Sequence, residues 1–264
     1  MYTFDRDVSV VEQSTGLFKA TVTNNWSVNG NPNGGYLMAL IANAMIRCAV
    51  KAATPIITAN FLSRAEPDEA EIRAERIYQS TQFDRIQASL FQRGRERIHA
   101  LGTFATEISG NTERHYEKSH PDVARLEDCV AMPEMPNYTI FNQMDVRLDP
   151  SCTGWMTGSV TEKSEIKGWI KFKDDRPWDT LSTILAIDCF PPPILASQGM
   201  VAWVPSIELS LNIRNLPETD WLKGIFRTCF MDNGILEEDG ELWDAHGILV
   251  AISRQFAQFR KAAT

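Results

Sequence analysis

One acidic side chain lies in surroundings where a charge is costly to place. Asp188 belongs to the run Leu-Ala-Ile-Asp-Cys-Phe that starts at Leu185. An unpaired carboxylate is expensive to bury, so such a residue is kept either for function or for a hydrogen bond to a helix end. Strongly perturbed acids in apolar settings gather at functional sites. We therefore favour a functional role for Asp188, with the helix-end hydrogen bond as the alternative.

The other reactive residue types form no recognised catalytic set. Cys189 could be a nucleophile, but no histidine lies near it in the sequence, and a buried small hydrophobe is the better interpretation. The four histidines have no partner at metal-ligand spacing, and HExxH is absent. GxSxG, Walker and GxGxxG patterns are also absent from the sequence. We expect no metal and no resident cofactor.

The first half of the chain alternates between strand-like and helix-like segments that would position these residues. Residues 17–23 alternate as a half-buried strand does, and turn formers fill residues 28–35. Residues 36–47 are helix formers and apolar on nearly every face, which predicts a helix surrounded by protein. Strand-like stretches follow at 56–64, 71–79, 83–92 and 97–107.

The second half repeats this order. A strand-like run at 164–173 leads through a turn into a mostly apolar helical stretch at 178–189, which prolines 191–193 stop. Three strand-like runs follow, at residues 204–214, 221–232 and 248–259.

The two halves also align residue by residue. Residues 61–64 match residues 211–214, and a proline follows three positions later in both. The repeat predicts a pseudo-twofold α+β structure, in which an antiparallel sheet curls around an apolar helix twice. We expect an N-terminal unit at 1–110, a polar connector at 111–136 and a C-terminal unit at 137–264. Ligand sites often form at such an interface.

Composition narrows the class of protein. The 264 residues carry 34 acidic and 26 basic side chains, a net charge of −8, which argues against a nucleic-acid partner and against a membrane surface. Five scattered cysteines without a CxxC pair favour a reducing compartment. The N-terminus lacks the pattern of a signal peptide, so we expect a cytoplasmic protein. The oligomeric state stays open, a homo-oligomer included.

Three segments together resemble a known family. They are Asn33-Gly34-Gly35-Tyr36 before the apolar helix, the run from Trp203 to Leu209, and the run from Gly247 to Gln255. In this order they resemble the thioesterase-like superfamily of double-hotdog proteins, which includes the bacterial acyl-CoA thioesterase II enzymes. The resemblance covers nearly the whole chain. It implies a double-hotdog fold and an acyl thioester as the small-molecule partner, with coenzyme A present only as part of the substrate.

The resemblance also implies three catalytic residues. In that family an aspartate late in the second helix, a Thr or Ser that begins a following strand, and a Gln on the last strand orient the attacking water. The matching residues are Asp188, Ser206 and Gln255. The sequence departs from the family at Glu208, where relatives often have Asp, outside the triad. The first half offers only an asparagine and a threonine at the positions of Asp188 and Gln255, which implies a single site in the second unit.

These residue types suit thioester hydrolysis. The leaving thiolate has a pKa near ~8.5 by the cysteine reference, so no strong general acid is needed. Asp188 can accept a proton from water, and Ser206 and Gln255 can each hold that water. Backbone N–H groups at the helix start would stabilise the oxyanion, and Gly34 and Gly35 permit a close approach.

Each role has a purely structural alternative. Strict alternation groups Ser206 with Glu208 on a solvated face of its strand. Gln255 could be an exposed edge residue, and Gly34 and Gly35 could form only the turn that starts a helix.

We therefore expect hydrolysis of an acyl-CoA or related acyl thioester. Two alternatives remain on the same fold. One is a tailoring enzyme of secondary metabolism that cyclises or dehydrates a polyketide-like acyl group, because a fold does not fix a function. The other is a non-catalytic acyl-binding module.

Overall fold

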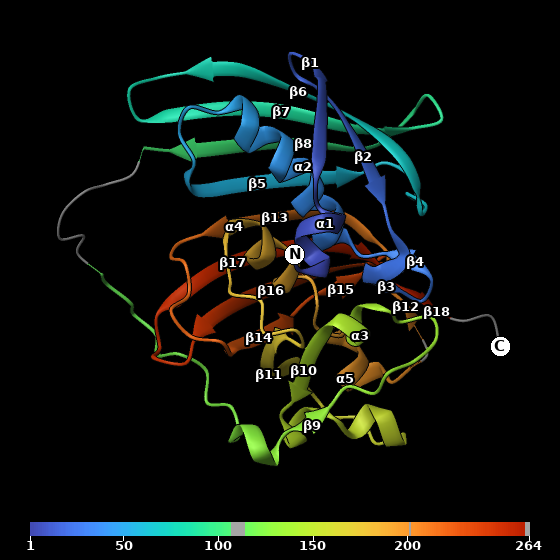
Figure 1. Cartoon of the computed structure of the whole chain (residues 1–264). Helices are drawn as coiled ribbons and strands as arrows, with labels where there is room; N and C mark the ends of the chain where they lie inside the picture. Colours follow the sequence, from blue (N-terminus) through green and yellow to red (C-terminus); the bar gives the residue numbers. More distant parts are fainter. Residues whose placement is uncertain (107–113, 201, 262–264) are drawn as a thin grey trace.

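A single antiparallel sheet runs through both halves of the chain and curves around its helices (Figure 1). The computed structural model describes residues 1–106, 114–200 and 202–261. The strand order is β1-β2-β6-β7-β8-β5-β13-β17-β16-β14-β11-β10-β9, and β15 pairs with β16. Read outward from the β5–β13 contact, each half contributes a curved sheet with a buried helix, which confirms the predicted pair of α+β units.

The first unit contains six long strands and the central helix. The strands are β1 (Val10–Ser14), β2 (Leu17–Val22), β5 (Ala53–Phe61), β6 (Asp68–Gln79), β7 (Phe83–Gln92) and β8 (Arg95–Ala105), with short β3 (Ser27–Val28) and β4 (Asn31–Pro32). The helices are α1 (Thr3–Asp7), the short η1 (Asn24–Trp26) and the long central helix α2 (Gly34–Cys48).

The second unit repeats the arrangement with a shorter helix. Its strands are β9 (Val130–Ala131), β10 (Met144–Leu148), β11 (Ser164–Phe172), β12 (Ala202–Trp203), β13 (Ser206–Ile213), β14 (Leu222–Thr228), β15 (Met231–Asp232), β16 (Ile235–Asp244), β17 (Leu249–Gln258) and β18 (Arg260–Lys261). Its helices are α3 (Ile140–Gln143), α4 (Thr180–Ala186) and α5 (Ile194–Gln198), with η2 (Leu126–Asp128), η3 (Pro150–Cys152) and η4 (Gly154–Thr157).

Helix α2 forms the core of the first unit, as its all-round apolar sequence predicts. Asn33 caps its start by accepting a hydrogen bond from the Tyr36 N–H at 3.0 Å. The Tyr36 hydroxyl donates to the Asp7 carbonyl at 3.0 Å and accepts from the Thr23 N–H at 3.1 Å. Burial raises the pKa of Tyr36 to about 12. The first turn of α2 is therefore fixed to both α1 and β2.

Helix α4 begins with a cap of a different kind. The Asp179 carboxylate accepts from the Ser182 N–H, and the Ser182 hydroxyl accepts from the Asp179 N–H, each at 2.8 Å, which is a capping box. Arg176, which is buried, pairs with Asp179 and with Asp5 of α1. The N-terminal end of α4 is therefore capped by the carboxylate of its own N-cap residue, Asp179.

Among the described strands of five or more residues, three were not predicted: β1, β10 and β16. Strand β16 is the most informative, because Glu237, Glu238, Asp239 and Glu241 give it a composition that is poor for a strand. It forms because β14 and β17 pair with it on both sides, so tertiary pairing overrides the local preference. The predicted helix at 178–189 is also too long, since α4 ends at Ala186.

The connector packs along the second unit. Trp169 donates through Nε1 to the Ala124 carbonyl at 2.9 Å, and Lys167 donates through Nζ to the Asp122 carbonyl at 2.7 Å. Its first residues, 111–113, lie outside the described residues. None of the described helices has the length and hydrophobicity needed to cross a membrane.

Strands β5 and β13 join the two sheets. Thr58 lies opposite Ser210, and the Thr58 hydroxyl donates to the Ser210 hydroxyl at 2.9 Å. Ile57, next to Thr58, points inward and is fully buried, whereas Ile56 points outward with 47% of its surface exposed. The core therefore continues across this seam.

This difference gives a matched pair of variants. Ile57→Ala removes buried methyl groups at the seam and should lower the free energy of unfolding by about 2–4 kcal/mol. Ile56→Ala, on the outer face, should lower it by less than about 1 kcal/mol. Urea unfolding followed by circular dichroism measures both, and equal losses would contradict the inward orientation of Ile57.

Candidate active site

Asp188 lies just beyond the end of α4 rather than within the predicted helix. Its N–H donates to the Leu185 carbonyl at 3.1 Å in a tight final turn. The helix cannot continue far, because Pro191 has no N–H to donate and disfavours helical geometry in the residue before it. The early end of α4 at Ala186 places the Asp188 carboxylate beyond the helix, next to the first unit.

The Asp188 carboxylate meets the start of α2. Its Oδ2 accepts from the Gly35 N–H at 2.9 Å and from Asn33 Nδ2 at 2.9 Å. Asn33 Nδ2 also donates to the Asp188 carbonyl at 2.7 Å. The positive end of the α2 dipole favours an anion at this position. The predicted acid is therefore held at the interface between the two units.

Burial and hydrogen bonding act on Asp188 in opposite directions. Burial is the larger effect and raises the pKa of Asp188 to about 6, while the hydrogen bonds from Gly35 and Asn33 and the nearby N–H of Gly34 lower it. The residue keeps partial access to solvent. At neutral pH, Asp188 is thus mostly ionised and is a stronger base than an ordinary aspartate, which suits a general base.

Gly34 and Gly35 let the acid and the helix approach each other. A Cβ on Gly35 would lie 2.8 Å from the Ile184 carbonyl oxygen and 2.9 Å from Asp188 Cβ. A Cβ on Gly34 would lie 2.9 Å from Asp188 Oδ2 and 3.0 Å from the Phe61 ring. Both glycines therefore do more than form a turn. The Gly35 N–H, expected to bind an oxyanion, is directed at Asp188 here.

Ser206 lies on the inner face of the sheet because of a β-bulge. Ser206 pairs with Ala257, but Glu208 pairs with Phe256, so β13 has one extra residue between the two pairs. A bulge shifts the following side chains to the opposite face. The alternative that groups Ser206 with Glu208 on one solvated face is therefore wrong.

Gln255 points to the same inner face. It is buried, with 7% of its surface exposed, and β17 lies between β13 and β16, so the edge-strand alternative is wrong. Its Nε2 donates to the Ser206 hydroxyl. The structure brings these two predicted residues into direct contact. In the described part of the chain, neither makes a hydrogen bond to Asp188.

Glu238 is a neighbour of the site that the sequence did not reveal. It lies opposite Gln255 in the β16–β17 ladder, and on β16 it falls between the buried Leu236 and Gly240. Burial raises the pKa of Glu238 well above its usual range, and the nearby Asp188 carboxylate raises it further. Glu238 therefore lies beside Gln255 and is also close enough to Asp188 for the two carboxyl groups to interact. The internal repeat could have revealed it. Four strands were predicted after the helix in the first half but only three in the second half, so a fourth strand was missing there.

Cys189 lies in surroundings that disfavour the reactive thiolate. It is buried, its thiol donates to the Leu185 carbonyl at 3.1 Å, and burial raises the pKa of the thiol well above its usual value. The expectation of a buried small hydrophobe is confirmed.

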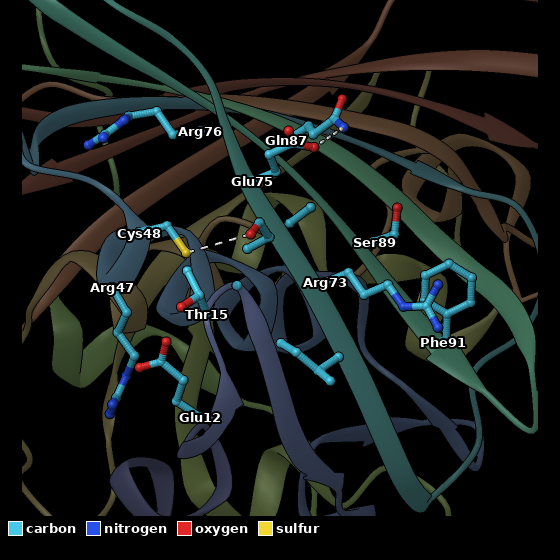
Figure 2. Close-up of a pocket in the computed structure, with 14 residues that line it drawn as sticks. Glu12, Thr15, Arg47, Cys48, Arg73, Glu75, Arg76, Gln87, Ser89 and Phe91 are labelled. Carbon is cyan, nitrogen blue, oxygen red and sulfur yellow. Dashed lines mark hydrogen bonds between the residues drawn. The ribbon is translucent and has the colours of Figure 1, made fainter.

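A groove of about 770 Å³ opens elsewhere, at the other end of α2 (Figure 2). Arg47 and Cys48 line it, whereas Gly34 at the helix start contacts Asp188. A helix of fifteen residues separates these ends by about 20 Å. Arg73 in the groove already pairs with Glu71 and lies 4.6 Å over the Phe91 ring. The groove is therefore separate from the predicted catalytic residues.

Comparison with known protein families shows to which family the chain belongs. Residues 22–105 match the acyl-CoA thioesterase N-terminal domain, and residues 126–259 match the acyl-CoA thioesterase C-terminal domain. The chain belongs to the acyl-CoA thioesterase family. It is accordingly a thioester hydrolase, as the resemblance implied. Among curated proteins, none matches the sequence.

Solved structures agree on the fold of this acyl-CoA thioesterase family member. A candidate thioesterase II from Thermobifida fusca YX is 24% identical with a TM-score of 0.90, over 99% of this chain and 98% of that one. A hotdog-fold protein of unknown function from Alicyclobacillus acidocaldarius is 18% identical with a TM-score of 0.89, over 100% of both chains. The double hotdog is thus confirmed.

A dehydratase domain is a more distant match. The dehydratase domain of PpsC from Mycobacterium tuberculosis, solved with C12:1-CoA, is 11% identical with a TM-score of 0.57, over 97% of this chain and 99% of that one.

The two glycines give a first test of the site. Gly35→Ala should cost about 1–3 kcal/mol of stability, because the new methyl group meets backbone carbonyls that cannot move aside. Gly34→Ala should cost less, because it meets the side chains of Asp188 and Phe61. Thermal unfolding measures both variants. A Gly35→Ala protein as stable as the parent would contradict the close contact with α4.

The raised pKa of Asp188 gives a second test. Between the ordinary aspartate value and about 6, the folded protein binds more protons at Asp188 than the unfolded chain does, so this residue makes stability fall as pH rises through that window. Asp188→Asn should therefore be more stable than the parent at pH 8, by about 1–3 kcal/mol. The difference should vanish near pH 4. Urea unfolding at pH 4, 6 and 8 measures it, and a less stable variant at pH 8 would contradict the desolvated carboxylate.

Proposed function

We propose that the protein hydrolyses acyl-CoA or a related acyl thioester by direct attack of water at a single site, with Asp188 as general base and with Ser206 and Gln255 positioning the water. The substrate enters between the two units, and coenzyme A leaves as the free thiol. The observation that carries this proposal is the placement of the Asp188 carboxylate on the first turn of α2, from the other half of the chain.

The hydrogen bonds of Asp188 support the role of base because they use one oxygen. Asn33 and Gly35 both donate to Oδ2. Among the described residues, Oδ1 receives no hydrogen bond, so it can accept the proton of an attacking water. A carboxylate fixed at one oxygen and open at the other keeps its orientation without losing its basic lone pair. General-base assistance of this kind is typically worth roughly 10²–10⁴-fold in rate.

Ser206 and Gln255 supply the second part of the water site. The Gln255 amide donates to the Ser206 hydroxyl, which orients that hydroxyl and leaves its proton free to bind an acceptor. The Gln255 carbonyl oxygen can accept a hydrogen bond from the same water. Both side chains lie on the inner face of the second sheet, so the water is held between that face and Asp188 at the end of α4.

The chemical steps need no further acid. Water attacks the thioester carbon as Asp188 takes its proton, and the carbonyl oxygen becomes an oxyanion. Collapse of this intermediate breaks the C–S bond and releases a thiolate, which takes the proton from Asp188 because the thiol pKa near ~8.5 lies above that of Asp188. Coenzyme A leaves as the free thiol, and Asp188 is again ionised. The N–H groups at the start of α2 supply the positive potential for the developing charge, and the Gly35 N–H positions the base.

The proposal predicts how each variant affects thiol release. With a panel of short, medium, long and aromatic acyl-CoAs, Asp188→Asn should lower kcat by about 10²–10⁴-fold. Ser206→Ala and Gln255→Leu should lower it by about 10–100-fold, because each removes one contact to water. In the parent, kcat/KM should fall about tenfold per pH unit below pH 6, as Asp188 becomes protonated.

The matched control is Glu208→Gln, on the same strand as Ser206 but beyond the bulge and on the other face. This variant should keep the parental rate. Equal thiol release by Asp188→Asn and the parent would refute Asp188 as base. Product mass spectrometry separates the reaction classes, since hydrolysis adds water whereas cyclisation and dehydration do not.

A further inference from the structure

A row of polar side chains crosses the inner face of the second sheet. Gln255 lies opposite Glu238, and Ser164 lies opposite Thr228. One step on from the pair of Arg227 and Asp239, Thr228 lies beside Glu238. Four strands therefore contribute Gln255, Glu238, Thr228 and Ser164 at one level of the sheet. At spacings of about 4.8 Å per strand, Glu238 is ~5 Å and Thr228 is ~10 Å from the Gln255 strand.

The ends of this row are satisfied, but its centre is not. Gln255 donates to Ser206, and the Ser164 and Ser197 hydroxyls lie 2.6 Å apart. Thr228 is 9% exposed, and its hydroxyl is buried without a hydrogen-bond partner. Glu238 makes no hydrogen bond among the described residues. An unsatisfied buried hydroxyl costs about 1–3 kcal/mol, so Thr228 beside a half-buried carboxyl group that has no hydrogen bond among the described residues indicates a missing partner.

The row also divides the apolar interior. On one side, Leu236, Ala257 and Ile194 form a small cluster that is separate from the main core. On the other side, Phe190 and Phe226 pack with ring centroids 4.9 Å apart and close off the main core. Thr228 and Glu238 thus lie between two apolar clusters, and Asp188 is close enough to raise the pKa of Glu238.

The chemistry of the two groups selects the missing partner. Burial and the nearby Asp188 carboxylate raise the pKa of Glu238 and so favour its neutral carboxyl form, which both donates and accepts. The Thr228 hydroxyl also donates and accepts. Such a pair suits a neutral oxygen group and disfavours an anion, because Asp188 and Glu237 add negative potential at Glu238.

We propose that Glu238 and Thr228 form a polar subsite for an oxygen substituent, a hydroxyl or oxo group, carried by the acyl chain close to its thioester carbon. This inference rests on the proposed hydrolysis at Asp188, since it defines where the thioester lies. It makes oxygenated acyl thioesters the favoured substrates over plain acyl thioesters of equal length.

The test measures binding first, so that it does not depend on turnover. In Asp188→Asn, calorimetry compares 3-hydroxybutyryl-CoA, acetoacetyl-CoA and butyryl-CoA. At least one oxygenated ligand should bind about tenfold more tightly than butyryl-CoA, the effect of one net hydrogen bond. Adding Thr228→Val or Glu238→Met should bring this ratio of Kd values towards one. The conservative changes Thr228→Ser and Glu238→Gln should preserve most of it.

The kcat/KM ratios of the same substrates in the otherwise unchanged protein should follow the binding ratios. Thr228→Val should also be at least as stable as the parent, because it removes an unsatisfied buried hydroxyl. Equal Kd values for plain and oxygenated ligands would overturn the subsite, as would a ratio that survives both apolar substitutions. A preserved binding ratio without thiol release by the parent would instead overturn the proposed hydrolysis alone.

Discussion

A carboxylate at the end of one helix, received by the first turn of another, organises the whole interface. Asp188 is costly to bury and is tolerated because α2 offers it a free N–H and a favourable dipole. That arrangement requires glycine at positions 34 and 35, and it requires α4 to stop early enough for Asp188 to turn out of the helix. Neither unit contains the complete arrangement, so the Asp188 carboxylate takes this position only when both halves are folded together.

The site depends equally on one irregularity in the sheet. Without the extra residue between Ser206 and Glu208, the Ser206 hydroxyl would leave the inner face and lose the Gln255 amide. A regular strand could offer Gln255 alone. The bulge thus adds a second polar group at the end of β13 while the rest of that strand keeps its apolar residues Leu209 and Leu211 towards the core.

Much of this architecture could be predicted from sequence, because its signals are local or repeated. The all-round apolar run at 36–47 marks α2, and the aligned halves mark the pseudo-twofold pair. Strand β16 could not be found in this way, since its acidic residues oppose a strand and only pairing with β14 and β17 enforces one. The same limit hid Glu238. The orientation of Ser206 was likewise out of reach, because a bulge is set by pairing between distant strands rather than by its own residues.

The two helix starts have diverged although the units share a plan. The α4 start is neutralised internally by Asp179, with Arg176 and α1 closed over it. The α2 start has only the uncharged Asn33 as its cap and is left to receive an acid from outside. In an assembly of identical copies, any substitution at such a position would act at every copy at once. Because the two units are fused in one chain, substitutions at the two helix starts are independent. The α4 start can therefore be optimised for stability and the α2 start for holding an acid from the other unit.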